Sequence, residues 1–144
     1  MNRYELSHVI YNMISGFGGA ALSAYIEITQ EIYIRNNQEM NLILQSGGSF
    51  LQPVVCTGLV NLANELHREA YGRYFVNPRY VPIIVTPALV LLELASPIIH
   101  ALTGFNIVYS KEDMIALLMG GLTAYLAVSL CVGQKKVTKY RIKK

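Results

Sequence analysis

The sequence predicts an all-α integral membrane protein with four transmembrane helices and both termini on the same, basic side. Three observations predict this class. Hydrophobic residues occupy 53% of the 144 positions and charged residues only 15%, against about 25% charged in a typical soluble domain. Four apolar stretches approach the length that spans a hydrocarbon core. The basic residues gather in alternate connections, as they do in proteins oriented by positive charge.

The four predicted spans form a single domain of residues 1–144 and cover residues 9–29, 50–66, 81–102 and 114–132. The third span carries one charged residue and the fourth carries none. The second is the most polar, with Gln52, Pro53, Asn61, Asn64 and Glu65. A lipid-exposed helix avoids such residues, so other helices must shield this segment if it crosses the membrane.

The distribution of charge supports four crossings. With four spans, Arg3, Arg68, Arg73, Arg79 and the basic tail at 133–144 share one side, and Arg35 and Lys111 lie on the other. Omitting the second span would divide the positive charge between the two sides. The termini are therefore expected to face the cytoplasm or the matrix, in a bacterial or mitochondrial inner membrane.

The tail is expected to contact the headgroups of anionic phospholipids, because a basic run after an apolar helix suits such lipids. Its basic residues are Lys135, Lys136, Lys139, Arg141, Lys143 and Lys144.

Small residues predict where the helices pack. Ser15, Gly19 and Ser23 follow at a spacing of four in the first span, and Gly120 and Ala124 do so in the fourth. Small side chains let membrane helices approach closely. We expect these two seams to pack against each other or against a neighbouring subunit.

The spacing of four from Ser15 continues to Glu27, Glu31 and Arg35, which predicts one shared helical face. Glu31 and Arg35 are expected to form an i,i+4 ion pair. Glu27 is either part of this interfacial charge group or an ion or proton site at the mouth of a path.

Glu93 is the deepest charge and lies between Pro87 and Pro97 in the third span, with Thr86 and His100 seven residues away on either side. Two hypotheses follow, because a carboxyl group at this depth must be neutral, paired or hydrated. In the first, Glu93 bonds across helices to Asn61, Asn64 or Gln52. In the second, Glu93 and His100 line a path for protons or small ions.

Motifs for chemistry are sparse. Cys56 and Cys131 are far apart and have no metal-ligand spacing. Glu65, His67 and Glu69 diverge on a helix, which favours a solvated helix end over a metal site. We therefore expect no enzyme, cofactor or metal site, and the composition excludes a basic nucleic-acid-binding domain.

The stretch "GGSFLQPVVCTGLVNLANELHR" at residues 47–68, with glycines in the first and fourth spans, resembles the Tim17/Tim22/Tim23 family of inner-mitochondrial-membrane proteins. The resemblance implies a four-helix membrane component with inward termini. The third span departs from that family because it lacks a glycine seam, so no residue's role is carried over.

The function expected from the sequence is that of a non-catalytic accessory subunit in a multi-subunit membrane complex. Its seams and its aromatic and basic connection near residues 72–80 would contact other membrane subunits and anionic phospholipid. The alternative is a homo-oligomeric channel or transporter for protons or small ions, with Glu93 and His100 along its path.

Overall fold

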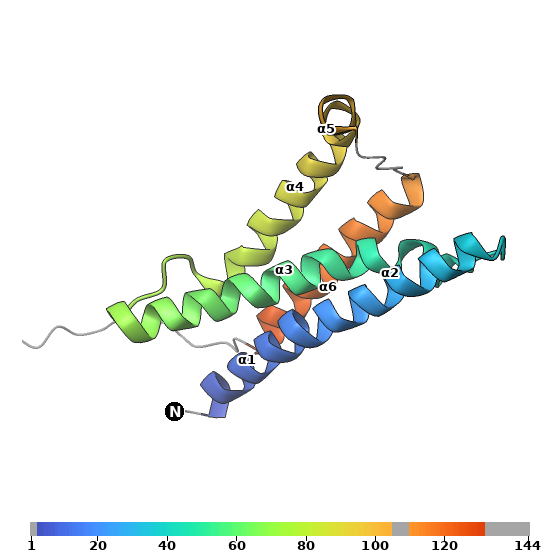
Figure 1. Ribbon diagram of the computed structural model, residues 1–144. Coiled ribbons are helices and arrows are strands. Elements are labelled where there is room, and N and C mark those ends of the chain that lie inside the picture. The colour runs from blue at the N-terminus through green and yellow to red at the C-terminus, as the bar shows by residue number, and fades with distance from the viewer. Residues whose placement is uncertain (1–2, 105–109, 132–144) are drawn as a thin grey trace, which may run out of the picture.

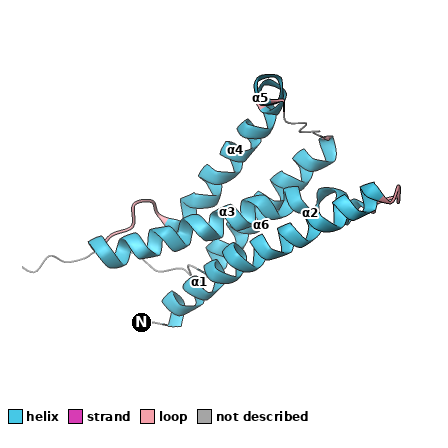
Figure 2. Ribbon diagram, in the orientation of Figure 1, coloured by secondary structure: helices cyan, strands magenta, loops and turns pink. Residues whose placement is uncertain are grey.

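The computed structural model describes residues 3–104 and 110–131, and all regular structure in these ranges is helical (Figures 1 and 2). Three of its helices are long and apolar enough to cross a membrane, or four if one bent pair forms a single span. The sequence prediction of an all-α chain with several candidate spans is therefore confirmed at this level.

The first long helix comprises α1 (Arg3–Met13), the π-helix η1 (Ile14–Gly18) and α2 (Gly19–Arg35). It extends beyond the predicted span at both ends. The wider turns of η1 interrupt the regular α-helical spacing, so the residues of α1 and α2 that face the bundle do not follow one unbroken periodicity.

The central helix is α3 (Leu42–Tyr71), whose 30 residues make it much longer than the predicted 50–66. Asn41 begins it as an N-cap, with its side chain accepting a 2.9 Å hydrogen bond from the Leu44 N–H. Gly72 ends it with a φ of 73°, a left-handed conformation that glycine adopts without a Cβ clash. The sequence prediction was too short because polar residues at both ends were assigned to connections.

The third predicted span is divided. After the 3₁₀ turn η2 (Pro78–Tyr80), α4 (Val81–Leu94) ends at Ala95, and α5 (Ser96–Thr103) continues at a bend of 49°. Pro97 lacks the N–H that would bond to the carbonyl four residues earlier, which accounts for the break. The last helix, α6 (Lys111–Cys131), agrees with the predicted fourth span.

The bundle is organised around α3, which packs against α6, against α1 and α2, and against α4. The far end of α4 and all of α5 diverge from the bundle (Figure 1). At one end of the bundle, the start of α1 lies beside the C-terminal ends of α3 and α6 and the start of α4 (Figure 1). We call this the basic end because Arg68, Arg73 and Arg79 lie there.

The interior is rich in polar and small side chains, whereas the exterior is apolar. Buried polar residues are His8, Asn12, Ser15, Ser46, Thr57, Asn61, Asn64, Glu65 and Ser96. Large hydrophobic residues are exposed along every long helix, including Phe17, Ile28, Ile43, Leu91, Ile115 and Leu130. This distribution is the one expected when hydrocarbon surrounds the helices and packing depends on small residues and internal hydrogen bonds.

Candidate functional site

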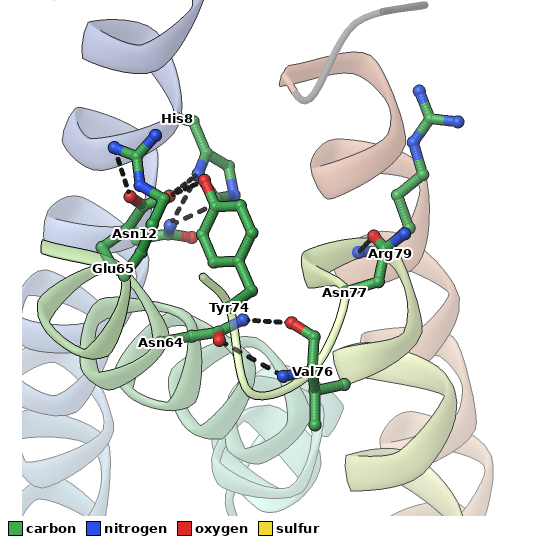
Figure 3. A network of polar contacts seen from close by, with 9 residues as sticks. His8, Asn12, Asn64, Glu65, Tyr74, Val76, Asn77 and Arg79 are labelled. Atoms are coloured by element: carbon green, nitrogen blue, oxygen red, sulfur yellow. Dashed lines mark hydrogen bonds and ion pairs between the residues drawn. The ribbon is translucent and has the colours of Figure 1, made fainter. Parts of the chain in front are cut away.

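A buried polar network at the basic end is centred on Glu65 of α3 (Figure 3). Its Oε1 atom lies 3.0 Å from Nδ1 of His8 and accepts a 2.8 Å hydrogen bond from the Tyr74 hydroxyl. Its Oε2 atom lies 2.9 Å from a guanidinium nitrogen of Arg68. The side chains of His8 and Glu65 are 6% and 10% exposed, so this carboxyl group is removed from solvent and surrounded by donors.

Helical spacing and one chain reversal bring the network together. His8 and Asn12 are one turn apart on α1, and the Asn12 amide nitrogen lies 3.3 Å from Nε2 of the His8 ring. After Gly72 reverses the chain, Tyr74 returns to α3, where the Arg68 guanidinium lies over its ring at 5.2 Å from the centroid. A buried carboxylate is tolerated only when such partners surround it.

Asn64 fixes the connection between α3 and α4 from within. Its amide nitrogen donates to the Val76 carbonyl at 2.5 Å, and its side-chain oxygen accepts from the Phe75 N–H at 3.0 Å. The Asn77 side chain then accepts from the Arg79 N–H at 3.1 Å and begins η2. Because Asn64 is fully buried, it supplies the hydrogen bonds that this stretch of backbone cannot obtain from a helix.

The sequence interpretation of Glu65 as part of a solvated helix end was wrong, since Glu65 is buried against α1. The polar groups His8 and Asn12 on α1 were missed. Together with Ser15 of η1 they recur at helical spacing at the start of an apolar helix, and all three are buried. That spacing was the available signal, because an amphipathic membrane helix turns its polar stripe toward other helices.

The seams of the first and last helices were expected to pack against each other or against a neighbouring subunit, but Gly19 and Gly120 both face α3. A Cβ added at Gly120 would lie 2.0 Å from the Phe50 carbonyl oxygen of α3. One added at Gly19 would lie 2.8 Å from Cγ2 of Val55, also on α3. Ala124 is fully buried and Ser15 is 6% exposed, so both belong to packed helix faces.

Gly58 and Gly121 mark two further close approaches between helices. A Cβ at Gly58 would lie 2.5 Å from the Gly16 nitrogen, so α3 and η1 cross almost backbone to backbone. A Cβ at Gly121 would lie 2.4 Å from Oγ1 of Thr86, so the Thr86 side chain of α4 packs directly on the α6 backbone there.

The stripe predicted from Ser15 to Arg35 does not remain on one face. Ser23 is half-buried, whereas Glu27 is exposed and the neighbouring Ile26 is buried. A step of four residues rotates the direction by about 40°, so three steps move it by about 120°. The predicted ion pair is confirmed, with Glu31 and Arg35 at 2.5 Å.

Glu93 is half-buried on α4. The described residues form no hydrogen bond with it, so the bond predicted to Asn61, Asn64 or Gln52 is not seen among them, and Asn64 bonds to the connection instead. Asp113 of α6 lies near enough to interact electrostatically with Glu93. The bend at Ala95 breaks the predicted stripe from Thr86 through Glu93 to His100. For His100 the structure describes only its place in α5.

The basic tail predicted to contact lipid, from Lys135 to Lys144, lies outside the described residues. Within residues 3–104 and 110–131, no three His, Cys, Asp or Glu side chains converge into a group that could hold a metal. Cys56 and Cys131 are free thiols.

Comparison of the chain with protein-family models, with curated proteins and with solved structures gives no match. The fold and the network define a class, an all-helical protein whose long helices are apolar enough to cross a membrane.

Proposed function

We propose that this chain is a non-catalytic subunit of a multi-subunit membrane assembly. In this proposal it crosses an inner membrane four times, with α4 and α5 as one bent span and both termini on the cytoplasmic or matrix side. The clustering of Arg68, Arg73 and Arg79 at the basic end supports this orientation.

The observation that carries the subunit proposal is Glu93 on the diverging part of α4. Around it, Leu91, Leu92 and Leu94 are 66%, 58% and 62% exposed. Lipid can cover these leucines at no cost, but it cannot solvate a carboxyl group. A helix from another subunit can cover the exposed leucines and also donate a hydrogen bond to the Glu93 carboxyl group.

The buried network around Glu65 supports a structural rather than a catalytic role. Its groups are directed at one another, with His8, Tyr74 and Arg68 all on the same carboxyl group. Such an arrangement ties α1, α3 and the connection 72–77 together, as a subunit with a fixed binding surface requires.

The test is extraction of the full chain from its membrane in a mild detergent, followed by mass spectrometry of co-isolating chains. We expect foreign membrane subunits in a fixed ratio. Glu93→Leu should reduce their recovery at least about fivefold, since an unsatisfied buried hydrogen-bonding group costs about 1–3 kcal/mol. Glu27→Leu is the matched control, because Glu27 is exposed on α2. Isolation of a monomer, or equal recovery with both variants, would contradict the proposal.

A homo-oligomeric channel or transporter is the second candidate, favoured by the electrostatic interaction between two carboxyl groups, Glu93 and Asp113. A ring of identical chains would gather several such pairs around one axis. Isolation of that ring, with proton or cation flux in liposomes that Glu93→Gln abolishes, would favour this candidate over the subunit.

A further inference from the structure

The last turns of α3 and the connection to α4 carry a group of aromatic and basic side chains that the network around Glu65 does not use. We call His67, Tyr71, Arg73 and Phe75 the headgroup platform. Tyr71 and Phe75 are 72% and 50% exposed, and Arg73 is exposed between them in the sequence. His67 is partly buried beneath these residues.

His67 organises the platform. Its ring centroid lies 4.7 Å from that of Tyr71 and 5.6 Å from that of Phe75, the latter edge to face. Its Nδ1–H donates a 2.8 Å hydrogen bond to the Arg73 carbonyl. One side chain therefore fixes both aromatic rings and the backbone that carries the arginine.

The backbone of the platform is held equally firmly. Asn64 bonds to the backbone of Phe75 and Val76 from the interior, and Gly72 closes the end of α3 through a 2.7 Å hydrogen bond to the Arg68 carbonyl. Its polar backbone groups are thus satisfied on the inner side, while its side chains are displayed outward. A surface ordered before binding loses little entropy when it binds.

The position of the platform selects its partner. It begins where one candidate span ends, at Tyr71, and finishes just before the next begins, at Pro78. Aromatic rings beside arginine at such a boundary match the glycerol and phosphate region of a bilayer. An arginine guanidinium pairs with a phosphate through parallel hydrogen bonds, and the leaflet facing positive loops contains anionic lipid.

We propose that the headgroup platform binds the phosphate of an anionic phospholipid through Arg73, with Tyr71 and Phe75 packed on its glycerol and upper acyl region. This proposal depends on the chain lying in a membrane but not on its assembly with other subunits. Glu69, exposed on the last turns of α3, is the opposing charge nearest in sequence. It weakens the site without occupying it.

The test uses the full chain in nanodiscs of phosphatidylcholine with a minority of phosphatidylglycerol, with lipid retention measured by native mass spectrometry. Arg73→Gln should lower phosphatidylglycerol retention about fivefold, which corresponds to about 1 kcal/mol for one basic residue near the surface. Lys111→Gln is the matched control, since it also removes one positive charge. Lys111 begins α6, at the end of the bundle away from the headgroup platform (Figure 1). Glu69→Gln should raise retention by a similar factor.

Equal retention with Arg73→Gln and Lys111→Gln would overturn the proposal. Asn64→Ala tests the preordering, because it frees the connection and leaves every charge in place, and it should lower retention about threefold. If that variant does not fold, the comparison of Arg73→Gln with Lys111→Gln still decides. Loss of a co-isolating acidic protein with Arg73→Gln, at unchanged lipid retention, would assign the platform to a protein partner and refute lipid binding.

Discussion

Gly120→Ala is expected to be the most damaging conservative change in the bundle. The added Cβ would lie 2.0 Å from the Phe50 carbonyl oxygen and 3.3 Å from the Phe50 Cα. Cβ atoms essentially never approach another atom closer than 3.0 Å, so α3 and α6 must separate by about 1 Å, the difference between 3.0 and 2.0. Backbone atoms cannot rotate away as a side chain can. The variant should therefore lose about 3 kcal/mol of folding free energy, the upper part of the range for overpacked cores.

Gly48→Ala provides the control for this prediction. Gly48 also lies within a helix, but an added Cβ there meets nothing within 4 Å. Alanine is favoured over glycine in a helix by up to about 1 kcal/mol, so this variant should be neutral or stabilised. Unfolding in mixed micelles, followed by circular dichroism as SDS is increased, measures both. If the two variants unfold at the same SDS fraction, the close contact between α3 and α6 is refuted.

Two further predictions use the same unfolding assay. His8→Leu should destabilise the bundle by about 3 kcal/mol, because the buried Glu65 carboxylate loses a partner. Adding Glu65→Gln to this variant should restore part of the lost stability. A double variant no more stable than His8→Leu would contradict the pairing. Gly72→Ala should lower the free energy of unfolding by about 1 kcal/mol, because an L residue is strained at a φ of 73°. Stability equal to that of Gly48→Ala would show that this turn adopts another conformation.

Local features of the sequence predicted that the chain is helical and located some of its helices. Apolar length located α6 closely, since its predicted and observed bounds nearly coincide. The ion pair between Glu31 and Arg35 also follows from spacing alone, because residues four apart on a helix are always neighbours. Prediction failed where apolar length was a poor guide, as in α3, where the polar residues on either side of the apolar stretch continue the same helix.

The candidate site could not be predicted in the same way. His8 and Glu65 are 57 positions apart, so no local pattern on either helix identifies the other as its partner. Glu93 shows the opposite case, since the polar second span offered Asn61, Asn64 or Gln52 as a partner, but the Asn64 side chain bonds to the backbone of residues 75 and 76. A single polar group has several chemically suitable partners, and only the docking of helices chooses among them.

The sequence by itself determined that this protein is helical and that its long helices are apolar enough for a membrane, because composition and helical length are properties of each segment alone. Only the tertiary structure decided that α3 is the centre, that Gly120 and Gly58 are crossing points, and that Glu65 is buried. The physical reason is that small residues and polar stripes permit many helix pairings. Backbone approach at particular glycines, together with the satisfaction of each buried polar group, selects one of them.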